Sequence, residues 1–319
     1  MGKDLKTSFE SRRKAQKRIT ECRLVFTTCI GASLGLLRGE KFEIVLIDEA
    51  SQQIEAMSLV PLVKGCERAV LVGDHVKLRA TIRNHAKLVN FDISLFERMY
   101  GEHDRPEVCK VMLDTQYRMH RDVCSFSSTE FHGGVLATAV PDNSRPLPPS
   151  EFPWPASTAN NGGRKVFIQC SNTEDLGRQS KSNRGQANLC RDVCKLLSTS
   201  NDQKERPVKP SIVVLTPYTR QIELLRGMLL EVEIFSIDGF QGREADIVVF
   251  VTVRCNEHKE MGFLKDLRRL NVAMTRAKAG VIIIGDQSTL SGGDDEVSAA
   301  VWKRLIGSCT LVKLEDPMA

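Results

Sequence analysis

The chain has 319 residues, of which 41% are hydrophobic and 27% are charged. This balance is typical of a globular protein with one large or two ordinary domains, and it excludes a disordered or collagen-like chain. Lys and Arg number 45 against 40 for Asp and Glu, which gives a formal net charge of +5. So small an excess permits a polyanionic partner without indicating one.

Short runs of β-branched and apolar residues alternate with helical patterns along the chain, and this alternation predicts an α/β fold. Continuous apolar runs such as 247–251 favour parallel strands that helices cover on both faces. The predicted strands are 23–27, 44–47, 69–72, 110–113, 166–169, 212–215, 232–237, 247–253 and 281–284. The predicted helices are 54–64, 122–131, 184–198, 220–231, 266–278 and 296–306.

Two polar stretches interrupt this order. Residues 102–106 form a polar connector, and residues 140–163, rich in Pro, Ser, Asn and Gly, predict a long surface loop. We place a domain boundary near residue 105, which gives a first domain of residues 1–105 and a second of residues 106–319. The basic residues of the first twenty positions favour a solvated helix face over an RNA-binding arm.

The ten cysteines follow no spacing typical of a disulfide framework. Cys190 and Cys194 lie four residues apart in a helical pattern, but no second Cys/His pair completes a zinc site, so we expect reduced, mostly buried thiols. No apolar run approaches the length of a membrane span, and the charged N-terminus lacks the apolar core of a secretory signal. We therefore expect a cytoplasmic or nuclear protein with no membrane association.

Two predicted strands of the first domain end in acidic residues. The run 44–47 ends in Asp48 and Glu49, and the run 69–72 ends in Gly73 and Asp74. Ligands of open α/β sheets bind beyond the carboxyl ends of the strands. In a nucleotide-driven motor the Asp would hold Mg²⁺ and the Glu would orient or deprotonate the attacking water. An acidic loop after a strand is the alternative interpretation.

Polar segments also punctuate the second domain. The run 114–120 contains Arg118, whose guanidinium could bind a phosphate. Thr216 follows a predicted strand, with Gln221 one helical turn further on. In the segment 237–244, two glycines would let the backbone approach a ligand closely.

A basic helical pattern closes this series at residues 268–278. Its spacing predicts that Arg269, Thr275 and Arg276 lie near a helix surface, with Leu270 and Ala273 turned inward.

In this order the segments resemble superfamily 1B helicases, most closely the up-frameshift RNA helicases of nonsense-mediated mRNA decay. The resemblance runs from about residue 25 to residue 284. The residues that carry it are Asp48-Glu49-Ala50-Ser51-Gln52, Gly73-Asp74-His75, Gln116-Tyr117-Arg118-Met119-His120, Phe240-Gln241-Gly242-Arg243-Glu244 and Leu270-Asn271-Val272-Ala273-Met274-Thr275-Arg276.

The resemblance implies two RecA-like domains of the P-loop NTPase type, with ATP in the cleft between them. By family analogy Asp48 binds Mg²⁺, Glu49 activates water, and Arg118 and Arg276 act as arginine fingers on the γ-phosphate. Further nucleotide contacts are implied for Asp74, Lys77, Gln116, Gln241, Gly242 and Glu244. Single-stranded RNA would lie across both domains, and Thr28, Thr216 and Arg243 resemble segments of that track. A monomer that binds RNA, or alternatively DNA, and decay-factor proteins is the expected form.

The sequence departs from the family in two places. It contains no Gly-x-x-x-x-Gly-Lys-Ser/Thr, the loop whose N–H groups and Lys cradle phosphates, so we expect the first domain to be a remnant. Lys77 also replaces a family Gln, and an ammonium offers no hydrogen-bond acceptor. We expect the chain alone to hydrolyse ATP negligibly, which leaves three readings: a piece of an RNA helicase, a pseudo-helicase that binds RNA or protein, and a DNA helicase of the same superfamily.

Overall fold

The computed structural model describes residues 2–82, 84–102, 106–156, 163–177, 180–199 and 210–314, without the side chains of residues 2–9, 12 and 84. The chain divides into two compact units, Met1–Val111 (unit 1) and Met112–Ala319 (unit 2). Residue 105, where we predicted the boundary, lies outside the described residues. Within the described ranges, no helix combines the length and apolar character that crossing a membrane requires.

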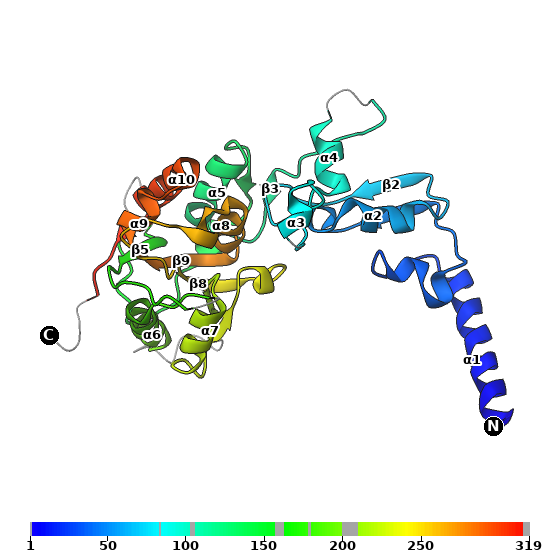
Figure 1. Cartoon of the computed structure of the whole chain (residues 1–319), viewed down its shortest axis with the longest axis horizontal. Coiled ribbons are helices and arrows are strands. Elements are labelled where there is room, and N and C mark those ends of the chain that lie inside the picture. Colours follow the sequence, from blue (N-terminus) through cyan, green and yellow to red (C-terminus); the bar gives the residue numbers. More distant parts are fainter. Residues whose placement is uncertain are drawn as a thin grey trace. The chain divides into compact units, whose positions relative to one another are not determined.

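Unit 1 is built around a pair of short parallel strands (Figure 1). Ile44 lies opposite Arg68 and Ile47 lies opposite Leu71. The helices and strands of the unit are α1 (Gly2–Glu21), β1 (Ile44–Ile47), α2 (Glu55–Leu62), β2 (Arg68–Leu71), α3 (Asn84–Lys87) and α4 (Leu95–Gly101). The prediction of a strand at 23–27 is wrong: these residues pair with no described strand, and Phe26 is 94% exposed.

Among the described residues, one face of this strand pair is packed and the other is exposed. Val45, Ile47 and Ala50 form a small buried cluster, whereas Ile44 and Leu46, which alternate with them, are 67% and 65% exposed. Successive residues of a strand point to opposite faces, so the apolar run of β1 fits burial on both faces but obtains it on one.

Unit 2 contains a six-stranded sheet among its described residues, in the order β10-β5-β9-β8-β6-β7, with every pairing parallel. The α/β prediction, with parallel sheets flanked by helices, is confirmed. The strands are β5 (Lys165–Gln169), β6 (Ile212–Leu215), β7 (Glu233–Phe235), β8 (Ala245–Val251), β9 (Ala277–Gly285) and β10 (Thr310–Leu311). The helices are α5 (Arg121–Phe131), α6 (Arg184–Ser198), α7 (Thr219–Arg226), α8 (Leu267–Met274), α9 (Gln287–Ser291) and α10 (Glu296–Gly307).

The predicted strand at 110–113 is also wrong. Val111 and Leu113 are 76% and 75% exposed. A strand begins only at Thr115, two residues after the predicted strand ends. It is β3 (Thr115–Gln116), which pairs in parallel with β4 (Ala137–Thr138). Local β-strand propensity predicted the wrong residues, because a strand also needs a neighbouring strand to pair with its backbone N–H and C=O groups.

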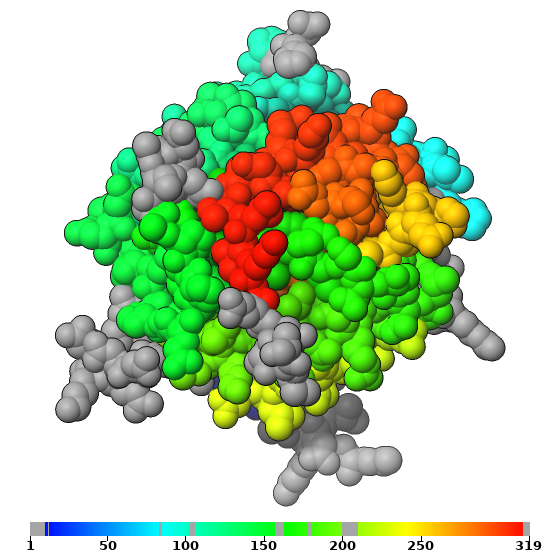
Figure 2. All heavy atoms as spheres, turned by 90° about the vertical axis from the view of Figure 1, so that its left-hand side faces the viewer, coloured from blue at the N-terminus to red at the C-terminus, as the bar shows by residue number. Residues whose placement is uncertain are grey.

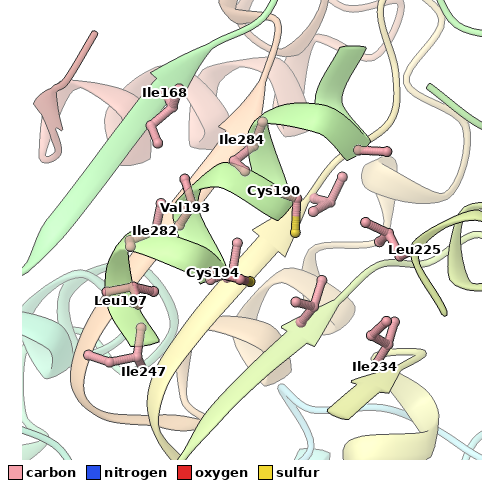
Figure 3. Close-up of a cluster of buried hydrophobic side chains, with 14 of the residues drawn as sticks. Ile168, Cys190, Val193, Cys194, Leu197, Leu225, Ile234, Ile247, Ile282 and Ile284 are labelled. Atoms are coloured by element: carbon pink, nitrogen blue, oxygen red, sulfur yellow. The ribbon is translucent and has the colours of Figure 1, made fainter. Parts of the chain in front are cut away.

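Helices cover both faces of the six-stranded sheet. On one face, Cys190 and Cys194 of α6 belong to one buried hydrophobic cluster with Ile168, Ile282 and Ile284 of the strands (Figure 3). Phe250 of β8 packs instead on Trp302 of α10, with ring centroids 6.0 Å apart. All ten cysteines are free thiols, and six of them are buried, as predicted.

The sheet joins segments that are far apart in the chain. In Figure 2, red residues near the C-terminus lie against green residues from the middle of the chain, and β10 pairs with β5 with Thr310 opposite Val166. The predicted surface loop 140–163, described only in part, also reaches inward. Phe152 is 3% exposed, and a Cβ on Gly280 would come within 2.8 Å of Trp154. Gly280 in β9 therefore leaves the space that the Trp154 ring fills.

A strained residue follows β8. Val253 is fully buried and has a φ of 70°, a conformation that β-branched residues rarely adopt. Its N–H donates to Oε1 of Gln186 (2.7 Å) and its carbonyl accepts from Nδ2 of Asn183 (3.0 Å). Such a backbone costs about 1–3 kcal/mol and persists only where its surroundings hold it.

Candidate nucleotide and nucleic-acid sites

The carboxylates of unit 1 lie at the carboxyl end of β1, as predicted. Asp48 and Glu49 are both exposed. Oδ1 of Asp48 accepts from the N–H of Glu49 (2.9 Å), and the carboxylate of Glu49 accepts from the amide of Gln52. Glu49 has a φ of 51°, so the chain turns sharply and presents both carboxylates to solvent.

The segment after β2 packs on this turn. The N–H of Asp74 donates to Oγ of Ser51 (3.2 Å), and a Cβ on Gly73 would lie 3.0 Å from the N atom of Ser51, which explains the glycine. Nζ of Lys77 forms an ion pair with Asp74 (3.0 Å). Lys77 therefore neutralises Asp74, where a glutamine in its place could both donate and accept hydrogen bonds.

These residues fit a magnesium ion that takes its remaining ligands from elsewhere. Mg²⁺ is usually held by one or two carboxylates, with water and phosphate oxygens completing its shell. Asp48 offers such a carboxylate, with Glu49 beside it. Over the described part of the chain, no group of three or more His, Cys, Asp or Glu side chains could hold a metal unaided. The phosphate-binding loop that would complete the site is absent from the 319 residues.

In unit 2, the side chain of Gln116 organises the loop that carries Arg118. Its Oε1 accepts from the N–H groups of Arg118 (2.8 Å) and Met119 (2.7 Å). Its Nε2 donates to the carbonyl of Met119 (2.8 Å) and to the hydroxyl of Thr138. The Gln116 side chain therefore uses its hydrogen bonds to hold this loop together. The family resemblance implied instead that this side chain contacts the nucleotide.

The side chains of Arg118 and Lys278 both meet Glu244. Nε of Arg118 donates to Oε2 of Glu244 (2.6 Å), and Nζ of Lys278 lies 3.0 Å from Oε1 of the same carboxylate. Hydrogen bonds from Arg118 and then from Lys278 hold the pKa of Glu244 below its usual value. Glu244 precedes β8 and Lys278 lies near the start of β9, so this cluster forms at the amino edge of the sheet.

Arg276, the second predicted finger, is 3% exposed. Its guanidinium donates to the carbonyls of Val272 (3.0 Å) and Arg243 (3.3 Å) and to Oγ1 of Thr275 (3.1 Å). The prediction that Thr275 and Arg276 lie near a helix surface is wrong, because α8 ends at Met274 and the chain turns inward toward β9. Leu270 and Ala273 are buried and Arg269 is partly exposed, as predicted.

The segment before Glu244 is shaped by a stacked arginine. The guanidinium of Arg243 lies 4.5 Å from the ring centroid of Phe235 and 4.9 Å from that of Phe240. Gly242 has a φ of 80°, which glycine adopts without strain. Nε2 of Gln241 is buried and has no hydrogen-bond partner. Buried donors of this kind usually bond to a ligand or to an ordered water molecule.

The two other predicted nucleic-acid residues differ in exposure. Thr28 is exposed, and its Oγ1 accepts from the N–H of Gly31 (3.0 Å). Thr216, beyond the carboxyl end of β6, is fully buried and its hydroxyl has no hydrogen-bond partner. Thr216 therefore supports this edge from beneath.

A buried ion pair lies near the same edge. Nε of Arg254 lies 2.9 Å from Oε2 of Glu174, and both residues are almost wholly buried. The N–H of Cys255 donates to the same oxygen (2.8 Å). This network fixes the chain just beyond Val253.

Ser51 and Lys278 were not predicted from the sequence to have a role of their own. Ser51 stands inside a quoted motif, and only the structure shows that its hydroxyl joins the two strand-end loops. Lys278 is the second residue of β9 and the last residue of the basic segment 268–278. Its place in that basic segment is the signal that could have identified Lys278.

Two family profiles, both described as an AAA domain, match residues 2–85 and 91–288 of the chain. The second alone covers more than half of the sequence. The chain belongs to this AAA-domain family.

Among the curated relatives, the chain is 36% identical over 310 residues to the regulator of nonsense transcripts 1 homolog of Arabidopsis thaliana, covering 90% of this chain and 24% of that protein. It is 35% identical over 282 residues to the ATP-dependent helicase NAM7 of Saccharomyces cerevisiae (84% and 28%). It is 32% identical over 285 residues to the DNA polymerase alpha-associated DNA helicase A of Schizosaccharomyces pombe (85% and 41%).

These relatives confirm the resemblance to superfamily 1B helicases of the up-frameshift type. The chain spans between about a quarter and two fifths of the lengths of these three proteins.

Proposed function

We propose that this chain forms part of the core of an ATP-dependent helicase that acts on single-stranded RNA during the decay of faulty mRNA. One observation carries the proposal: the chain is 36% identical, over 90% of its length, to a regulator of nonsense transcripts. The positions of the motif residues support it, because exposed carboxylates end β1 in unit 1 and cations converge before β8 in unit 2.

In unit 1, Asp48 would hold Mg²⁺ and Glu49 would orient the attacking water and take its proton. The exposure of both carboxylates supports these roles. Bound Mg²⁺ would neutralise phosphate charge, and the ion pair between Lys77 and Asp74 would limit how strongly Asp74 attracts the same cation.

In unit 2, Arg118 would neutralise the charge that develops on the transferred phosphoryl group. Gln116 would hold the Arg118 loop in place, and Arg276 would act from beneath as a positioning residue, because its guanidinium is bonded to carbonyls inside the unit. Gln241 and Gly242 would contact the nucleotide, and Glu244 would lie beside that contact, paired with Arg118 and Lys278.

The nucleic acid would be bound mainly through its phosphates, with Thr28 and Arg243 on the track and Thr216 supporting it. The stacking of Arg243 on two phenylalanine rings supports such a contact, because it holds a half-exposed cation in one orientation. We further propose a monomer that works in the cytoplasm and contacts decay-factor proteins.

Binding of one labelled 12-nucleotide sequence as RNA and as DNA, followed by fluorescence anisotropy, tests the proposal. We expect the purified chain to prefer the RNA, with affinity falling steeply as salt rises. Arg243→Ala should weaken binding, whereas Lys303→Ala, which removes an exposed cation from α10, should not. A chain that binds neither strand at low salt would refute the nucleic-acid role, and tighter DNA binding would favour the reading supported by the DNA helicase relative.

A pseudo-helicase is the second candidate, and two observations favour it: the sequence has no phosphate-binding loop, and Lys77 replaces a glutamine. We expect the 319-residue chain to bind RNA yet show no RNA-stimulated ATP hydrolysis above background. RNA-stimulated turnover that Glu49→Gln abolishes would exclude the pseudo-helicase reading.

A further inference from the structure

One carboxylate in unit 2 lies between two cations. Nε of Arg118 is 2.6 Å from Oε2 of Glu244, and Nζ of Lys278 is 3.0 Å from Oε1. Each oxygen of the Glu244 carboxylate thus has its own cationic partner. The two cations are therefore spaced to pair with an anion that presents two oxygens on one side.

The Arg118 guanidinium is held by a second contact besides Glu244. Its Nη1 donates to the carbonyl of Thr275 (3.1 Å). The N–H of His120 donates to the backbone carbonyl of Lys278 (2.8 Å), which ties the Arg118 loop to the start of β9. Arg118 would therefore keep its position if the carboxylate left, and a preorganised donor binds an incoming anion with little cost of ordering.

The cluster is open to solvent. The side chains of Arg118, Lys278 and Glu244 are 31%, 26% and 41% exposed. Two cations and one anion leave a net charge of +1. The carboxylate is the most exposed of the three, so it can swing toward water while the Arg118 guanidinium stays bonded to the Thr275 carbonyl.

Lys278, and not Arg276, is the cation that accompanies Arg118. Arg276 is 3% exposed and donates to the carbonyls of Val272 and Arg243, so exposing it would break hydrogen bonds inside the unit. Lys278 is partly exposed and already pairs with an anion.

We propose that Arg118 and Lys278 form a phosphate-binding site, and that Glu244 occupies it as a built-in competitor until a phosphate displaces its carboxylate. The inference rests on the proposed function, since it names a regulated phosphate contact within that nucleotide site. The guanidinium fork matches phosphate and carboxylate alike, so after the exchange Nε of Arg118 and Nζ of Lys278 would again face anionic oxygens.

Binding of inorganic tripolyphosphate to the purified 319-residue chain, measured by isothermal titration calorimetry, tests this competition. Glu244→Gln keeps the shape of the side chain but removes its charge, and we expect it to bind tripolyphosphate about tenfold more tightly than the parent chain. Adding Lys278→Met to Glu244→Gln should abolish that gain, and adding Lys278→Arg should restore most of it. Equal affinities for Glu244→Gln and the parent chain would overturn the inference.

Two controls separate charge and folding from the site itself. Lys303→Met removes one positive charge from the exposed side of α10, so a loss as large as that from Lys278→Met would also overturn the inference. Tryptophan fluorescence during urea unfolding reports on unit 2, because Trp154 and Trp302, the two tryptophans of the chain, both belong to it. Each variant is compared only after its unfolding midpoint matches that of the parent chain.

A parallel titration with single-stranded RNA identifies the source of the phosphate. Tighter binding of tripolyphosphate alone by Glu244→Gln assigns the site to a nucleotide, and tighter binding of RNA alone assigns it to the nucleic-acid backbone. If RNA binds but Glu244→Gln changes neither affinity, the inference fails while the proposed function stands. If RNA does not bind but the tripolyphosphate gain appears, the proposed function fails while the phosphate site stands.

Discussion

Parallel strands with apolar runs form both units, yet only unit 2 covers both faces of its sheet. In unit 2, β8 has burial from Ile247 to Val251 without interruption, and helices lie on either side (Figure 1). In unit 1, every second residue of β1 is exposed. The same residue type therefore contributes very different amounts of stability in the two units, because apolar burial and not composition sets the free energy.

The units also differ in how polar side chains stabilise them. Unit 1 joins α2 to α4 through a pair of partly exposed side chains, Arg98 and Glu55, whose atoms approach to 2.7 Å. Unit 2 buries Arg254 with Glu174, and a backbone N–H donates to the same carboxylate oxygen. Solvent and salt reach the first pair but not the second, so the two units should respond differently to ionic strength.

The largest difference between the units should come from replacing one phenylalanine by alanine in each of them. Phe250→Ala in unit 2 should lower the free energy of unfolding by about 3–5 kcal/mol, because Phe250 is 1% exposed and its loss leaves a cavity beside Trp302. Phe26→Ala in unit 1 should change it by less than about 0.5 kcal/mol, since Phe26 is 94% exposed. Urea unfolding followed by tryptophan fluorescence and circular dichroism measures both. Similar losses of unfolding free energy for the two variants would show that the Phe26 side chain is packed in unit 1.

A smaller effect is expected from Asn183→Ala. The Asn183 side chain caps α6 by accepting from the N–H of Gln186 (3.0 Å), and it donates to the carbonyls of Asn172 and Val253. Its loss should destabilise unit 2 by about 1–2 kcal/mol. The same fluorescence measurement checks this value, with Asn183→Asp as the control that keeps the cap but loses the donor. An unchanged midpoint for Asn183→Ala would show that α6 does not need this cap.

Mild acid should weaken unit 2 through His120. Burial first, and then the charge of Arg164, lower the pKa of His120 below its usual 6.5. Its Nδ1 accepts from the N–H of Asp122 (3.2 Å) at the start of α5, which requires the neutral ring. Because the unfolded state takes up the proton more readily, this contribution is complete above pH 6.5 and is lost as the pH falls. We expect a loss of about 1 kcal/mol between pH 7 and pH 5.

His120→Asn keeps a capping acceptor that does not titrate. Its unfolding midpoint should vary less between pH 7 and pH 5 than that of the parent chain. Parallel pH profiles for the two proteins would rule out His120 as the source of the acid sensitivity. Asp122, Asp142 and Arg121 also face the ring, and they remain unchanged in this comparison.

The smallest effect should come from Arg98→Met in unit 1. Arg98 pairs with Glu55 and with Glu102, but its side chain is 39% exposed, so we expect a loss below about 1 kcal/mol. Hydrogen exchange of the amides in α2 and α4 measures it. Raising the salt concentration should reduce protection of these amides in the parent chain more than in the variant. A salt effect of equal size in the parent chain and the variant would show that the ion pairs of Arg98 do not stabilise unit 1.

The sequence predicted elements well wherever local pattern and packing agree. The helix at 184–198 and the strands at 44–47 and 212–215 form with the predicted bounds, because an apolar stripe or run is bounded there by polar or turn residues. The predicted strands at 23–27 and 110–113 do not form, since propensity alone cannot show whether a partner strand lies alongside.

Residue types and motif order located the site candidates, but not their surroundings. Spacing placed Arg276 on a helix surface, whereas three acceptors around its guanidinium hold it inside. Thr216 likewise lies buried beneath the edge that it was expected to line. These outcomes depend on long-range packing, which a local pattern does not contain. The resemblance also left Lys278 unassigned, although it meets the same carboxylate as Arg118.

Val253, which follows β8 and has a positive φ, links the position of α6 to the conformation of the chain beyond the strand. Two amides from one helix start, those of Asn183 and Gln186, restrain the peptide of Val253 against its own preference. A small shift of α6 along its axis would loosen both restraints together and let the peptide turn. The next residue, Arg254, would then lose its alignment with Glu174, so a displacement of the helix would change the charge pairing just beyond β8.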